Sequence, residues 1–69
     1  MKMVKIIEVI GTSDQGFTEA TENALKEAAK TVKNIQSIYV KHLNANVENN
    51  NIVSYAVNAK ISFLIDKDA

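Results

Sequence analysis

The stretch Ile52-Val-Ser-Tyr-Ala-Val-Asn-Ala-Lys-Ile-Ser-Phe-Leu-Ile65 decides the fold, because its residue types alternate along its whole length. Every second residue from Val53 to Ile65 is apolar, whereas the positions between them are a mixture of apolar and polar residues. Successive side chains of a β-strand point to opposite sides of a sheet. The pattern therefore predicts a strand with one apolar face and one mixed face.

A second strand is predicted at 36–47, joined to the first through the turn Glu48-Asn-Asn-Asn51, because asparagine tolerates the left-handed backbone conformation of tight turns. With Val47 opposite Ile52, the first arm contributes four residues to the apolar face of the hairpin: Ile38, Val40, His42 and Asn44. Its remaining residues fall on the mixed face: Ser37, Tyr39, Lys41, Leu43, Ala45 and Val47. A β-bulge in either arm would shift this register.

The chain upstream of the hairpin contains one strand and one helix. Residues 3–10 are short and rich in β-branched residues, which predicts a strand that ends at Gly11. A turn at 11–16 follows, and apolar or small residues then recur at steps of three and four, which predicts a helix over 17–35. The element order β-α-β-β indicates a single α+β domain, 1–69, with a three-stranded antiparallel sheet wrapped around one helix.

The small size of the chain predicts self-association. A domain of 69 residues buries only about 60% of the surface that its unfolded chain exposes. The chain has no cysteine, so neither disulfides nor a thiolate-bound metal can add stability. The strands are too long for one helix to cover, and the mixed face of the hairpin is expected to pack against another copy of the chain.

Composition excludes several classes of partner and site. Eight lysines balance eight carboxylates, and the sequence contains no arginine, which argues against a nucleic-acid-binding protein. No segment approaches the roughly 18 apolar residues of a membrane-spanning helix, and no signal-peptide pattern opens the chain. We therefore expect a cytoplasmic protein with neither a nucleic-acid nor a membrane partner.

The residues that carry reactive groups do not form a catalytic motif. The spacing of Gly11 and Gly16 matches only the start of a phosphate-binding loop, since Phe17 stands where the motif continues with glycine. The single histidine, His42, is expected to be partly buried or at an interface. Glu8 lies between isoleucine and valine, and we expect it to be shielded and paired with a lysine across an interface. These observations predict that the protein is not an enzyme.

Several segments together resemble the dodecin family. They are Lys5-Ile-Ile-Glu-Val-Ile-Gly-Thr-Ser13, then Glu19-Ala20, Asn23-Ala24-Leu25, Ala28 and Thr31 in the helix, and Ile61-Ser-Phe63 in the last strand. The resemblance covers residues 3–65 in matching order and length. It implies the β-α-β-β fold, a hollow homododecamer built from trimers, and the binding, storage or buffering of flavin (riboflavin, FMN or FAD) without catalysis.

The resemblance also implies where a ligand would bind. Flavin-binding dodecins have a tryptophan that stacks on the isoalloxazine ring, and Ser37 occupies that position here. Ala56 replaces a glutamine that hydrogen-bonds the ring edge, and Asn44 stands where an arginine often occurs. Tyr39, on the same predicted face as Ser37 and Ala56, offers a substitute ring. Loss of the tryptophan and glutamine contacts predicts flavin affinity weaker by orders of magnitude.

Two hypotheses follow for the function. The first is a dodecin-like shell that binds a flavin or another small ligand at its subunit junctions. The second is a flavin-free structural or calcium-binding shell, because oxygen-bearing side chains alternate along one strand and recur near the C-terminus: Asn44, Asn46, Glu48, Asp66 and Asp68. Alternate side chains of one strand lie about 6.6 Å apart, so such a cation site would need oxygens from another chain. No metal site is expected within a single chain.

Overall fold

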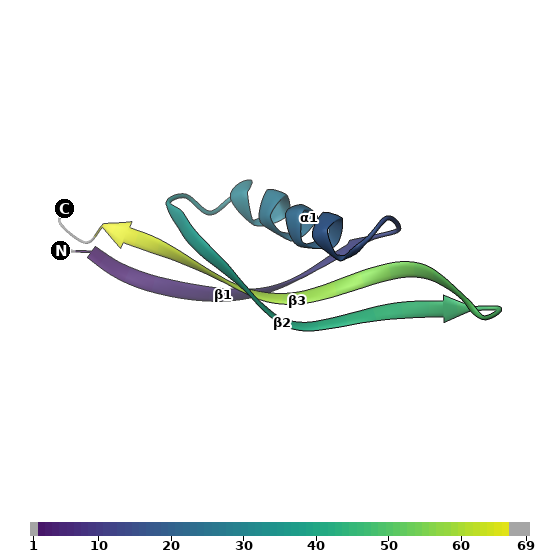
Figure 1. The fold of residues 1–69 in the computed structure, drawn as a ribbon. Helices are drawn as coiled ribbons and strands as arrows, with labels where there is room; N and C mark the ends of the chain where they lie inside the picture. Colours follow the sequence, from purple (N-terminus) through teal and green to yellow (C-terminus); the bar gives the residue numbers. More distant parts are fainter. Residues whose placement is uncertain (1, 67–69) are drawn as a thin grey trace.

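The computed structural model describes residues 2–66 and contains one helix and three strands. The elements follow in the order β1 (Lys2–Ser13), α1 (Phe17–Ala29), β2 (Ile35–Glu48) and β3 (Asn51–Asp66). The strands form one antiparallel sheet in the order β1-β3-β2, and α1 lies against one face of it (Figure 1). The β-α-β-β order and the three-stranded sheet are as predicted. The molecule is elongated, measuring 55 × 19 × 13 Å, because the β2–β3 hairpin continues beyond the helix.

The first strand is longer than predicted and continues through Gly11 to Ser13. Gly11 is required there because the helix passes directly over it. A Cβ atom at this position would collide with the carbonyl oxygen of Ala20 and would lie 2.7 Å from the Cβ of Ala24. Asn23 of α1 adds a hydrogen bond by donating from Nδ2 to the carbonyl oxygen of Thr12, at 2.9 Å. Gly11 therefore allows close packing of the helix, and it is not part of a phosphate-binding loop.

The helix begins after Gly16, as predicted, but it ends at Ala29 and not at residue 35. The amides of Thr31 and Val32 both donate to the carbonyl oxygen of Ala28, which closes the last turn. Asn34 then adopts a left-handed conformation with φ 62°, and its carbonyl oxygen accepts a hydrogen bond from the amide of Leu64 at 3.0 Å. The apolar periodicity thus continues past the point where the backbone leaves the helix.

The hairpin forms through the predicted asparagine turn, but its register changes along the strands. Asn49 and Asn50 have φ values of 52° and 65°, the signature of a type I′ turn. Val47 faces Ile52, and Ile38 faces Ile61, as expected from the predicted register. Between these points the register shifts at Asn46/Val47 and again between Val40 and His42. Each shift inserts an extra residue and so exchanges the two faces of the strand.

The predicted faces of His42 and Asn44 are therefore wrong. His42 pairs with Asn58 and Asn44 pairs with Ala56, so both lie on the face opposite the helix. His42 is exposed in the single chain, whereas partial burial or an interface position was expected. The reversal moves Leu43 instead to the strand position opposite Val57.

The hydrophobic core lies between α1 and the sheet. Three alanines of the helix, Ala20, Ala24 and Ala28, are at most 6% exposed. On β3 the helix covers Val57, Ala59 and Ile61, each of which is 0% exposed. Small alanine side chains let the helix approach the sheet closely, which explains why Gly11 is needed below it. Within residues 2–66, no helix is long and apolar enough to cross a membrane.

Candidate functional site

The face of the sheet opposite α1, called here the outer face, contains the residues that the sequence singled out. It comprises the even-numbered residues of β1 and β3 together with the residues of β2 that pair with them. Four successive rows cross the three strands: Ile6–Ser62–Ser37, Glu8–Lys60–Tyr39, Ile10–Asn58–His42 and Thr12–Ala56–Asn44. The rows show which side chains are neighbours across the sheet.

All four predicted ligand-binding residues lie on the outer face, but they do not form one cluster within the chain. Asn44 and Ala56 are direct cross-strand neighbours. Ser37 pairs with Ser62, which is six residues from Ala56 and therefore about 20 Å away along the strand. One small planar ligand therefore cannot contact both Ser37 and Ala56 of the same chain. A ligand that contacts both positions must lie between two chains.

Ser37 and Tyr39 are the two candidates for contact with a flavin ring, and they differ in whether their side chains are already bonded. The hydroxyl of Ser37 is hydrogen-bonded to the hydroxyl of Ser62, with the two oxygens 2.6 Å apart. Tyr39, in contrast, is 66% exposed and lies opposite Lys60. Tyr39 therefore presents the exposed aromatic ring of this face, next to a lysine.

Charged side chains gather in the centre of the outer face. Lys41 of β2 reaches across the middle strand and donates to Oε2 of Glu8 on β1, at 3.1 Å. The hydrogen bond and charge of Lys41 lower the pKa of Glu8 below its ordinary value, with smaller contributions from Lys60 and His42. Glu8 does pair with a lysine, but it does so within the chain and not across an interface as expected. The expected shielding is wrong, because the Glu8 side chain is 51% exposed.

Sequence reasoning did not predict this cluster, because its members come from three strands. The contact between Lys41 and Glu8 joins residues 33 positions apart, and it depends on the bulge between Val40 and His42. Lys60 lies opposite Glu8 in the register, yet it makes no ion pair within 4 Å among residues 2–66. The alternation of β3 had already placed Lys60 on the mixed face of the hairpin, which is the outer face of the structure.

A shallow depression beside the charged cluster contains an unpaired polar atom. The depression has a volume of about 430 Å³ and is lined by Glu8, Val9, Ile10 and Asn58. The side-chain oxygen Oδ1 of Asn58 is enclosed and has no hydrogen-bond partner in the described part of the chain. A buried acceptor without a partner costs roughly 1–3 kcal/mol. This cost makes Asn58 a weak point of the isolated chain.

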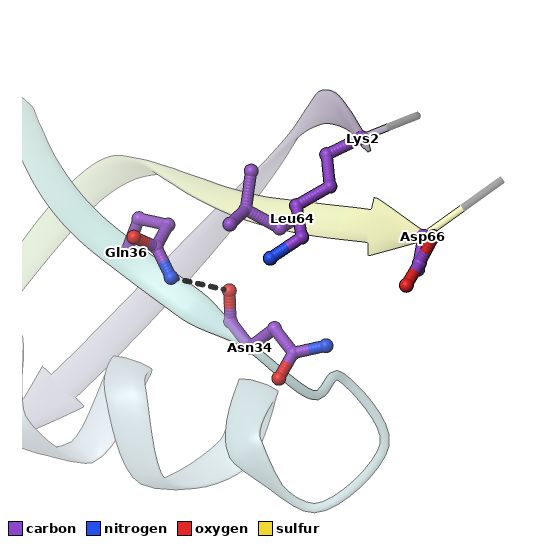
Figure 2. A pocket seen from close by; sticks show the side chains of 5 residues that line it. All are labelled: Lys2, Asn34, Gln36, Leu64 and Asp66. Carbon is purple, nitrogen blue, oxygen red and sulfur yellow. Dashed lines mark hydrogen bonds between the residues drawn. The ribbon is translucent and has the colours of Figure 1, made fainter. Parts of the chain in front are cut away.

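A second cavity, of about 260 Å³, lies where β1 and β3 meet the connection between α1 and β2 (Figure 2). Its lining residues are Lys2, Asn34, Gln36, Leu64 and Asp66. The carbonyl oxygen of Asn34 accepts hydrogen bonds from Nε2 of Gln36 at 3.2 Å and from the amide of Leu64. The sequence did not indicate this cavity, because the predicted helix included Asn34.

The oxygen-bearing side chains considered for a cation do not converge in one chain. Within residues 2–66, no group of three or more histidine, aspartate or glutamate side chains is placed to hold a metal ion. The amide of Asn46 donates to the hydroxyl of Ser54 at 2.8 Å, while Asn44 pairs with Ala56 two positions away. Asp66 lies at the opposite end of the sheet, and Asp68 lies outside the described residues.

Comparison with known proteins identifies one family along nearly the whole chain. The model of the family described as Dodecin matches residues 3–66. A dodecin from Thermus thermophilus is 27% identical over 66 residues, which cover 96% of each chain. A solved structure of the tt0972 protein from Thermus thermophilus superposes with a TM-score of 0.91 at 27% identity, over 97% of this chain and 98% of that one.

One further solved structure concerns a cation. It is a calcium dodecin from Mycobacterium tuberculosis, described as a calcium-chelating antigen with a novel calcium-binding site. It is 24% identical to this chain and superposes with a TM-score of 0.81, over 97% of this chain and 96% of that one. At this level of identity the likeness supports the shared fold alone.

Proposed function

The chain belongs to the dodecin family, and from this premise we propose that it is a small-molecule binding and storage subunit of a homododecameric shell. Dodecins are small ligand-binding proteins and not enzymes. The observation that carries the proposal is the outer face, which combines exposed apolar residues with the four candidate ligand-binding residues. We place its action in the cytoplasm.

The exposed apolar residues of β1 support the assembly. Val4, Ile6 and Ile10 are 59%, 60% and 68% exposed on the outer face. Burial of apolar surface contributes about 25 cal/mol per Å², so covering these side chains with another copy would stabilise both chains. Within residues 2–66, the helix lies on the opposite side of the sheet and does not cover this face. Self-association would therefore bury the apolar side chains that the fold of one chain leaves exposed.

The ligand proposed for this face is a flavin or a similar planar molecule, held between outer faces of two chains. Ser37 and Ala56 lack the stacking ring and the amide of the flavin-binding pattern, and the Ser37 hydroxyl is already bonded to Ser62. Tyr39 is the residue that can supply an aromatic surface. We therefore expect flavin to bind in the micromolar range or weaker.

Light scattering and a fluorescence titration of riboflavin with the purified protein test the proposal together. We expect a particle of about twelve subunit masses, and quenching of riboflavin fluorescence when the protein is added. A stable monomer contradicts the shell, and an assembly that fails to quench flavin contradicts the ligand. Calcium and magnesium provide a parallel titration, in which a rise in melting temperature at millimolar ion would favour the flavin-free, cation-binding alternative.

A further inference from the structure

The only histidine of the chain, His42, lies among charged groups in the centre of the outer face. Its register partner on β3 is Asn58, and the neighbouring row of the sheet contains Glu8 and Lys60. His42 contributes, after Lys41 and Lys60, to the lowered pKa of Glu8, so it lies within electrostatic reach of that carboxylate. Within residues 2–66 the helix lies on the other side of the sheet (Figure 1), so the groups that face His42 come from the three strands.

The charge of this cluster depends on His42 in mildly acidic solution. While His42 is neutral, Lys41 and Lys60 stand against the single carboxylate of Glu8, which leaves one net positive charge. Histidine ordinarily gains a proton between pH 8 and pH 5, and in a chain without cysteine no other side-chain type ordinarily changes charge in that range. Mild acid therefore raises the net charge of the cluster to two positive charges.

Self-association through the outer face would cover His42. Ile10 is 68% exposed, the largest exposed fraction among the exposed large apolar residues of the described chain. It lies in the same row as Asn58 and His42, with one strand between it and His42, which corresponds to about 10 Å. A second copy that buries Ile10 would therefore bury His42 as well. This step rests on the proposed function, in which the outer faces of two chains meet.

A proton on His42 opposes this contact in two ways. Burial disfavours the charged form of an imidazole. A two-fold contact also places the same patch on both sides of the interface, so each cluster would face a copy of itself, and like charges in contact are destabilising. Glu8 balances only one of the three cations, and its carboxylate is already paired with Lys41 at 3.1 Å. Both costs are absent while His42 is neutral.

We infer that His42 makes the self-association of the chain dependent on pH, so that the shell is stable while His42 is neutral and loosens when His42 is protonated. Light scattering along a dilution series of the ligand-free protein measures the effect. The subunit concentration at half-dissociation should rise about tenfold between pH 7.5 and pH 5.5 at low salt. Added salt should reduce this change, because it screens the repulsion between the two faces.

Three variants separate His42 from a general effect of acid. His42→Gln is neutral at both pH values, so it should remain assembled at pH 5.5 and lose the pH dependence. His42→Lys has a permanent charge and should already be loosened at pH 7.5, to the extent of the wild type at pH 5.5. Lys26→Gln removes an exposed lysine of α1, away from the outer face, and should keep the wild-type pH dependence. Circular dichroism of each variant shows whether the subunit remains folded.

The outcomes distinguish this inference from the proposed function. A dissociation midpoint that is equal at the two pH values, or a pH dependence that persists in His42→Gln, overturns the inference while the shell stands. Loss of assembly in His42→Gln at both pH values also overturns it, because a neutral side chain should preserve the contact. A wild-type protein that is monomeric at pH 7.5 contradicts the shell itself. Flavin is absent from every sample, so a failure of flavin binding does not affect the result.

Discussion

Both faces of the three-stranded sheet contain large apolar residues, but the two faces differ in what covers them. Toward the helix, Val57, Ala59 and Ile61 are completely buried by the chain itself. Toward the outer face, the neighbouring strand β1 presents Ile6 and Ile10 at 60% and 68% exposure. The helix-facing half therefore accounts for the fold of one chain, whereas the outer half is suited to other molecules. One face of the sheet therefore stabilises the fold, and the other face is available for binding.

The largest effect should come from replacing one isoleucine on each face of the sheet with alanine. Ile61→Ala leaves a cavity beneath the helix and should lower the free energy of unfolding by about 3–4 kcal/mol, measured by chemical denaturation. Ile10→Ala should preserve the circular dichroism spectrum of the subunit and weaken the assembly, seen as smaller particles on dilution. If Ile10→Ala disrupts the subunit as strongly as Ile61→Ala, the division between the faces is wrong.

Restoring the missing ligand contacts should have the next largest effect. The double variant Ser37→Trp with Ala56→Gln supplies a stacking ring and an amide, and it should tighten riboflavin binding about a hundredfold, or by roughly 3 kcal/mol. Fluorescence quenching measures the change. Ala45→Gln is a suitable control, because Ala45 pairs with Tyr55 on the helix-facing side of the strand. An equal gain from the control would show that the outer face has no special role.

The separation of the faces also explains how far sequence reasoning could go. The alternation of residues 52–65 follows directly from strand geometry, so the strand and its buried face were predictable. The end of the helix was not, because Thr31, Val32 and Ile35 continue the apolar spacing while Asn34 takes a left-handed conformation. The bulge between Val40 and His42 has no marker in residue type, and it reverses the face of Asn44.

The candidate site was predictable only in part, because some of its contacts depend on the tertiary structure. The alternation and register of the hairpin placed Ser37, Tyr39 and Ala56 on one face, and the resemblance to dodecins marked Ser37 and Ala56 as ligand positions. The ion pair between Lys41 and Glu8 depends on the bulge, on the strand order β1-β3-β2 and on a long side chain crossing the middle strand. None of these is encoded in a local pattern, so the charge cluster required the tertiary structure.

A smaller effect is expected where the helix meets the sheet. Gly11→Ala places a Cβ against Ala20 and Ala24, and it should cost about 2 kcal/mol of unfolding free energy because backbone atoms must move. Gly16→Ala is the matched control. Its added Cβ would meet only the carboxylate end of Glu19, at 2.6 Å, and its extended φ of 170° suits any residue. Equal melting temperatures for the two variants would contradict the close approach of helix and sheet.

The smallest effect should appear on the outer face when acid is added. Lys41 holds the pKa of Glu8 below its ordinary value of 4.5, so the folded chain binds this proton less readily than the unfolded chain does. The ion pair therefore stabilises the fold fully above pH 4.5 and loses this contribution as the pH falls through the lowered pKa. Glu8→Gln and Lys41→Gln should each remove the same small acid-dependent loss of stability, measured as melting temperature against pH. Because the pair is exposed to solvent, salt should weaken the effect, and identical profiles for the wild type and both variants would show that the two edge strands are not joined in this way.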